Sequence, residues 1–210
     1  EGKDPALRQM VIIGHSQGGL LTRMTVTDTG DRLWRIASDQ DLDTVPVSEA
    51  ERAELRRTFC YLPLPCVKRV VFIATPHRGS FLVGGRVSEF LRKLITLPLA
   101  MLSPLQEVFE RSPEAVATRS LKDDIPRSTD NMDPDSQFIK NYAAIPIAPG
   151  VIAHSIIAVD NPEDPKEDWN DGVVAYSSAH LEETASELIV HSGHSTQEEP
   201  ETIEEVRRIL

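Results

Sequence analysis

The chain contains 210 residues, 40% of them hydrophobic and 26% charged, and this balance predicts a folded globular protein rather than a chain disordered by composition. Its formal net charge of −11 argues against nucleic acid or an anionic membrane surface as the main partner. Cys60 and Cys66 fit neither a zinc site nor a disulfide scaffold, and a single bridge between them stays open. No apolar run is long enough for an integral membrane segment, and nothing in the sequence indicates the cellular compartment.

A Gly-x-Ser-x-Gly pattern follows an apolar run near the start of the chain. The strand predicted at about Gln9–Ile13 leads into this pattern, and a helix is predicted to begin near Gln17. Such a strand–turn–helix is a nucleophile elbow, which lifts a serine hydroxyl clear of the backbone in a strained conformation. We therefore predict Ser16 as a nucleophile and the Gln17 N–H as an oxyanion donor. Gly14 and Gly18 are expected to remove side chains that would collide across the turn.

Two insertions separate the predicted strands. Residues 31–65 form the first, with a helix predicted over Ser48–Thr58 and Ser48 as its N-cap. Residues 81–147 form a second, lid- or cap-like insertion, in which prolines divide the leucine-rich stretch Val87–Phe109 into short helical pieces. The apolar faces of these pieces suit a cover over an apolar pocket and packing on the sheet equally well. A final surface helix is predicted over Glu201–Leu210.

Three further strands are predicted, each ending at a loop that carries a candidate site residue. The strand at about Val67–Ala74 precedes His77, whose position favours a structural role over a catalytic one. The strands at about Val151–Val159 and Glu187–Val190 precede Asp171 and His194. Because the carboxyl ends of parallel strands meet at one edge of a sheet, these loops are expected to converge.

Other acidic residues compete with Asp171. Asp160 directly follows the strand predicted at about Val151–Val159. It ranks second to Asp171 as the carboxylate that would orient a catalytic histidine, ahead of Asp164 and Asp168 in the same loop. The segment Asp160–Asp168 is also rich in oxygen ligands, but it lacks the glycine-turn spacing of a calcium loop. We therefore interpret it as a solvated loop and predict no metal site.

Other histidines compete with His194. His191 is the main alternative base, but it extends a continuous apolar strand, whereas Gly193 gives His194 a flexible loop position. His154 lies inside a predicted strand and is interpreted as a hydrogen-bonded core histidine. His180 follows a small-residue segment, and its spacing gives no reason to assign it a catalytic role.

Four short blocks give the chain a family resemblance. In chain order they are GHSQGG, ATPHRGS (Ala74–Ser80), NDGVV with SSAHL, and GHS. With these blocks the chain resembles the lipase and esterase branch of the α/β-hydrolase superfamily. It is similar to bacterial triacylglycerol lipases and to hydrolases related to GPI inositol-deacylases. The blocks span Gly14 to His194, and their order of serine, acid and histidine is the order in that superfamily.

The resemblance implies a serine hydrolase that cleaves an ester through an acyl-enzyme. Ser16 would be the nucleophile, His194 the base, and Asp171 the residue that orients the imidazole, with His15 and His77 in the substrate pocket. No cofactor is implied, and the expected partner is a small-molecule ester or lipid with an apolar acyl part. An acyltransferase or thioesterase with the same triad is an alternative. A non-catalytic binding module on the same fold is another.

The predicted fold class is α/β, with a mostly parallel sheet of about four strands flanked by helices. In the resembled family the elbow follows the fifth strand, whereas here its strand opens at residue 10. We therefore expect residues 1–210 to be the C-terminal part of an α/β-hydrolase domain that lacks its N-terminal strands. The elbow strand would then lie exposed at one edge of the sheet. The second oxyanion donor would belong to the preceding strands, so this chain alone is expected to be poorly active.

Overall fold

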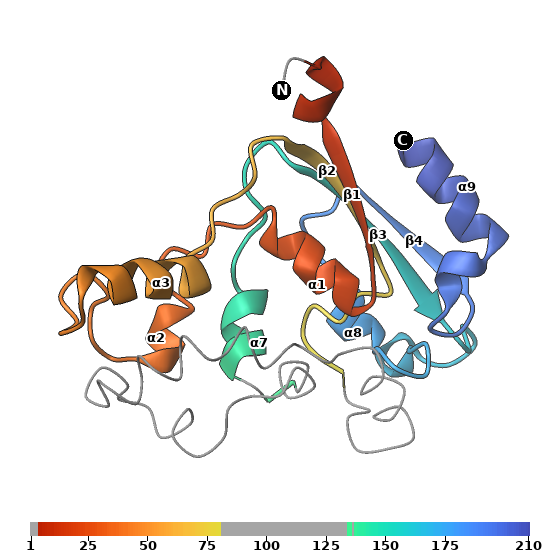
Figure 1. The fold of residues 1–210 in the computed structure, drawn as a ribbon. Helices are drawn as coiled ribbons and strands as arrows, with labels where there is room; N and C mark the ends of the chain where they lie inside the picture. The colour runs from red at the N-terminus through yellow and green to blue at the C-terminus, as the bar shows by residue number, and fades with distance from the viewer. Residues whose placement is uncertain (1–3, 81–133, 136) are drawn as a thin grey trace.

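A parallel sheet of four strands forms the centre of the fold (Figure 1). The computed structural model describes residues 4–80, 134–135 and 137–210. The strands are β1 (Met10–His15), β2 (Val67–Ile73), β3 (Ile152–Val159) and β4 (Ser186–His191), and their order in the sheet is β1-β2-β3-β4. All three neighbouring pairs are parallel. The predicted α/β class with a parallel sheet flanked by helices is confirmed, and the leucine-rich stretch at 87–109 lies outside the described residues.

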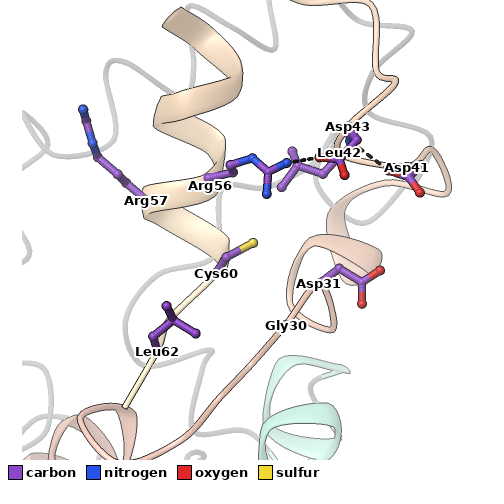
Figure 2. A pocket seen from close by; sticks show the side chains of 9 residues that line it. All are labelled: Gly30, Asp31, Asp41, Leu42, Asp43, Arg56, Arg57, Cys60 and Leu62. Atoms are coloured by element: carbon purple, nitrogen blue, oxygen red, sulfur yellow. Dashed lines mark hydrogen bonds and ion pairs between the residues drawn. The ribbon is translucent and has the colours of Figure 1, made fainter. Parts of the chain in front are cut away.

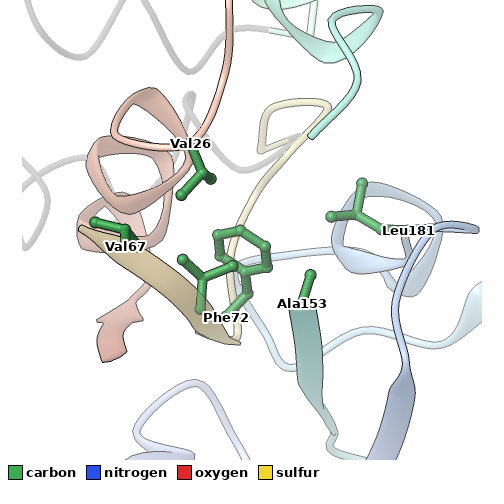
Figure 3. Packing of buried hydrophobic residues seen from close by; sticks show 6 residues of the cluster. Val26, Val67, Phe72, Ala153 and Leu181 are labelled. Carbon is green, nitrogen blue, oxygen red and sulfur yellow. The ribbon is translucent and has the colours of Figure 1, made fainter. Parts of the chain in front are cut away.

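The two central strands bury both of their faces over most of their length, and the residues that are not buried, Lys68, Arg69 and Ile152, lie toward the starts of the strands. Alternate residues of β2 point to opposite sides of the sheet. On one side, Val70 and Phe72 pack with Val26, Ala153 and Leu181 (Figure 3). On the other side, a second cluster contains Val71, Ile73, Ile156, Val190 and Ile209. Each face of the sheet therefore needs a covering layer.

Helices at the two ends of the chain supply these layers. Helix α1 (Gln17–Met24) contacts β1 and β2, whereas α9 (Pro200–Ile209) contributes Ile209 to the cluster on the opposite face. Figure 1 shows α1 and α9 on either side of the strands. The short α8 (Tyr176–Ala179) packs against β3. The predicted C-terminal helix is thus present, one residue earlier at each end than expected.

The segment between β1 and β2 contains two helices, α2 (Trp34–Ala37) and α3 (Glu49–Phe59). Ser48 caps α3 as predicted: its hydroxyl accepts from the Glu51 N–H, and the Glu51 carboxylate accepts from the Ser48 N–H. A small core of Trp34, Leu42, Val45 and Leu55 holds this segment together. Further along the chain, α7 (Gln137–Ala143) precedes β3. Three short 3₁₀ turns complete the described elements: η1 (Pro5–Arg8), η5 (Lys166–Asp168) and η6 (Thr196–Glu198).

Strand β1 forms one edge of the sheet, as predicted for the elbow strand. Within the described residues it pairs with β2 alone, and Met10 and Ile13 are 39% and 42% exposed. Cys60 and Cys66 are free thiols, so the bridge that the sequence left open is not formed. In the described part of the chain, no helix combines the length and the apolar character needed to cross a membrane.

A buried arginine ties α1 to two other segments. The Arg23 side chain is 1% exposed, and its Nη2 donates to the carbonyl oxygens of Ala143 and Ile145 at 3.1 and 2.8 Å. The guanidinium lies 5.5 Å from the centre of the Tyr142 ring and 3.9 Å from the Glu183 carboxylate. Because α1 begins directly after Ser16, Arg23 connects the helix behind the elbow to the chain that leads into β3.

Replacing Arg23 with Met should lower the free energy of unfolding by about 2 kcal/mol. Two carbonyl oxygens would lose a charged donor, and relief of the guanidinium's desolvation offsets only part of that loss. Urea denaturation measures the change. Arg35→Met is the matched control, because Arg35 is 57% exposed and forms a surface ion pair with Asp31. The control should change stability by less than about 0.5 kcal/mol, and equal effects of the two substitutions would contradict the assigned role of Arg23.

Candidate active site

Ser16 lies at the sharp turn between β1 and α1. Its backbone has φ 54° and ψ −128°, a region that side-chain-bearing residues rarely occupy. Although Ser16 stands at the N-cap of α1, its side chain makes no capping hydrogen bond. The hydroxyl is therefore available for another partner. Gln17 is the first residue of α1, so its N–H has no acceptor within the helix and is available as an anion donor.

Gly14 and Gly19 are the glycines near this turn that leave no room for a Cβ, and the prediction for Gly18 was wrong. A Cβ at Gly14 would lie 2.6 Å from the Gly18 oxygen and 2.7 Å from the Gly19 Cα. A Cβ at Gly19 would overlap the Thr75 side chain. A Cβ at Gly18, by contrast, would meet nothing within 4 Å. The approach at Gly14 is thus local to the elbow, as predicted, whereas the approach at Gly19 is between α1 and the chain after β2, which the five-residue pattern does not contain.

The structure brings Ser16, His194 and Asp171 together in one hydrogen-bonded series. The Ser16 Oγ lies 2.8 Å from the His194 Nε2, and the His194 Nδ1 lies 2.8 Å from the Asp171 Oδ2. A carboxylate only accepts hydrogen bonds, so the proton of the neutral imidazole belongs on Nδ1. Nε2 is then an acceptor for the Ser16 hydroxyl. The side chains of His194 and Asp171 are 9% and 1% exposed, which shields both bonds from water.

Backbone N–H groups fix the Asp171 carboxylate. Its Oδ1 accepts from the N–H groups of Val173 and Val174 at 2.9 and 2.6 Å, which leaves Oδ2 directed at His194. Gly172 has φ 85°, the left-handed conformation that this tight loop requires. The Ser80 hydroxyl donates to the Val173 carbonyl, so the chain after β2 also supports the Asp171 loop. No pattern in the sequence predicts this support.

The competing residues interact elsewhere. The His191 Nε2 donates to the backbone carbonyl of Asp160 at 2.9 Å, so these two alternatives lie beside each other at the ends of β3 and β4. The His154 Nδ1 lies 2.7 Å from the Ser186 hydroxyl, and burial lowers the pKa of its imidazole. The His180 Nδ1 lies 2.6 Å from the Glu187 carboxylate. His194, and none of these three histidines, is the one that the structure places against Ser16.

His77 is 0% exposed, so it lies in the interior of the protein and not on the wall of an open pocket. Its ring packs edge-on against Phe72, and its Nδ1 lies 3.5 Å from the Arg23 Nη1. Burial, followed by the nearby charges of Arg23 and Arg78, holds the pKa of His77 well below its ordinary value, so the ring is neutral. These contacts fit the structural role that its position favoured.

His15 lies beside the candidate base. Its Nε2 is 2.9 Å from the backbone oxygen of His194, and the two ring centres are 5.1 Å apart. The side chain is partly exposed. Its contact with the His194 backbone was not foreseen from the sequence, because it joins residues 179 positions apart.

A surface pocket of about 530 Å³ lies in the segment between β1 and β2 (Figure 2). Its lining includes Asp43 and Arg56, which form an ion pair with each other, and Cys60. None of the candidate site residues lines it. Among the described residues, no group of three or more histidine, cysteine or acidic side chains is arranged to hold a metal ion.

Proteins similar to this chain are found among solved structures. No family model matches the chain, and no curated protein matches it. Among solved structures, the chain is similar to a crystal structure of Staphylococcus hyicus lipase, with a TM-score of 0.44 and 13% sequence identity. The likeness covers 89% of this chain and 62% of that lipase. This chain therefore spans less than two thirds of the length of that protein.

The glycine geometry gives a test with an internal control. Gly19→Ala should lower the free energy of unfolding by about 3 kcal/mol, since the new methyl group overlaps the Thr75 side chain. Gly18→Ala, one residue earlier in the same helix, should leave stability unchanged or raise it by up to about 1 kcal/mol. Thermal and urea denaturation of the two variants checks the difference. Equal destabilisation would refute the close approach at Gly19.

Proposed function

We propose that this chain carries the catalytic centre of a serine hydrolase that cleaves carboxylic esters. The observation that supports this most directly is the series Ser16–His194–Asp171, with two hydrogen bonds of 2.8 Å, on a strained strand-to-helix turn. A serine hydroxyl becomes an effective nucleophile when an oriented base takes its proton. This arrangement of three side chains supplies both the base and the group that orients it.

In the first half-reaction, the Ser16 Oγ attacks the ester carbonyl while the His194 Nε2 takes the hydroxyl proton. The resulting imidazolium is stabilised by Asp171, whose carboxylate keeps its negative charge. The C–O bond to the leaving alcohol then breaks, and the Nε2 proton passes to the alkoxide. The products of this step are the free alcohol and an acyl group on Ser16.

In the second half-reaction, water attacks the acyl-enzyme while His194 again serves as the base. The acid leaves, and the proton returns to Ser16. In both halves a negative charge develops on the former carbonyl oxygen, and we propose the Gln17 N–H as one donor to it. A donor at the start of α1 also benefits from the positive end of the helix dipole.

The substrate is proposed to be a small-molecule ester or lipid with an apolar acyl part, and the reaction needs no cofactor. The apolar preference rests on the leucine-rich sequence at 87–109, whose structure is outside the described residues. Attack by an alcohol in place of water would give acyl transfer through the same three residues. The same centre would also accept a thioester.

Labelling by a fluorophosphonate probe tests for an activated serine directly. The wild-type chain should form a covalent adduct at Ser16, located by peptide mass spectrometry. Ser16→Ala should abolish the adduct. In a form of the protein that includes the N-terminal strands, it should also lower the turnover of a short-chain p-nitrophenyl ester by at least about a thousand-fold, since the three residues act as a unit. If the folded wild-type chain forms no adduct and turns over no ester, the hydrolase proposal fails and a non-catalytic binding module takes its place.

A pair of aspartate substitutions tests which carboxylate serves the base. Asp171→Asn should lose nearly as much activity as Ser16→Ala, because the amide can donate to Nδ1 and favour the wrong tautomer of His194. Asp160→Asn, in the same loop, should keep the rate within about twofold, since it has no part in the proton transfer. Steady-state ester hydrolysis separates them. Loss of activity in Asp160→Asn alone would mean that the acid is misassigned.

A further inference from the structure

The candidate nucleophile and base are carried by opposite edges of the sheet. Ser16 follows β1 and His194 lies in the loop after β4, and these are the outer strands of the order β1-β2-β3-β4. Three strand spacings of about 4.8 Å separate them, a span of about 14 Å. The loop after β4 must therefore cross the end of the sheet to reach Ser16. A loop in that position needs contacts that hold it at its far end.

The chain around Ser16 supplies two contacts to residue 194, one to its ring and one to its backbone. The Ser16 hydroxyl meets the His194 Nε2, while the His15 Nε2 meets the His194 carbonyl oxygen at 2.9 Å. A carbonyl oxygen only accepts, so the His15 Nε2 carries the proton and donates. Two neighbouring residues of the elbow therefore form hydrogen bonds with His194, one with its ring and one with its carbonyl oxygen.

His15 donates this hydrogen bond as a neutral ring. Burial is the main cause that lowers the pKa of His15, and the nearby His194 lowers it further, against the opposing effects of the backbone hydrogen bond and Asp171. A neutral imidazole has a single N–H, and here that donor is committed to the His194 carbonyl. A neutral neighbour also adds no positive charge next to His194 when that ring becomes protonated during the proposed reaction.

We propose that His15 is a positioning residue that sets the location of the His194 imidazole relative to the Ser16 hydroxyl. It acts through the His194 backbone and takes no part in the proton transfer itself. This role rests on the proposed function for its effect on catalysis, although the hydrogen bond and its effect on the His194 ring are independent of any substrate. It differs from the expected role of His15 as a substrate-pocket residue.

The test compares His15→Gln with His15→Met. The two replacements are unbranched and similar in length and volume, but only glutamine offers an N–H near the position of the histidine Nε2. His15→Met should lower kcat for p-nitrophenyl ester hydrolysis about ten- to a hundred-fold with little change in KM, because the base is misplaced while substrate contacts remain. His15→Gln should recover kcat to within about threefold of the wild type.

Proton NMR of the imidazoles provides a readout that needs no turnover. The wild-type chain and His15→Gln should both show a sharp downfield resonance from the His194 Nδ1–H, which donates to Asp171. In His15→Met this resonance should broaden or move, as the ring samples other positions. His15→Leu repeats the donor-free case with a different shape, and thermal unfolding of each variant establishes that the fold is retained.

The outcomes are distinguishable. If the Met and Leu variants fold and keep both the resonance and the wild-type kcat, the positioning role is overturned. It is also overturned if the Gln and Met variants are impaired equally, because the shared loss of the ring would then be the cause. If the wild-type chain forms no fluorophosphonate adduct and has no esterase activity, the hydrolase proposal fails, yet the resonance still decides whether His15 holds His194.

Discussion

All four strands run in the same direction, and this constraint determines where chemistry can occur in the molecule. Parallel pairing brings the carboxyl ends of all four strands to the same end of the sheet, so the loops that follow the strands lie together there. Three of these loops carry Ser16, Asp171 and His194. The loop after β2 carries no member of the series, but its Ser80 hydroxyl supports the Asp171 loop and its Thr75 packs against α1.

The sequence was informative wherever the signal is local. The Ser48 cap of α3 needs only Glu51 three residues later, and the buried strands β2 and β3 are visible as apolar runs. The distinction between Gly18 and Gly19 is not local, because it depends on Thr75, which lies in the loop after β2. Likewise, the contact of His15 with the His194 carbonyl depends on a loop 179 residues away. Such long-range approaches leave no periodic pattern in the sequence.

Arg23 and His77 show how a polar centre can be built inside this fold. The guanidinium satisfies two backbone carbonyls on the chain leading into β3, while the neutral His77 ring packs against Phe72 from the loop after β2. An arginine in the last turn of a helix is ordinarily expected at a solvated position, yet Arg23 is 1% exposed here. The sequence alone does not reveal this burial, because the carbonyl acceptors lie more than a hundred residues away.

The way in which Asp171 is held has a consequence for how freely its loop can vary. Its Oδ1 is bound by two main-chain N–H groups, and no side chain takes part in that bond. Every amino acid except proline offers such a group, so positions 173 and 174 can change identity without releasing the carboxylate. The orientation of the acid is encoded in the path of the backbone. Sequence drift at these two valines is therefore constrained by packing around the loop, and proline alone is forbidden by the hydrogen bonds themselves.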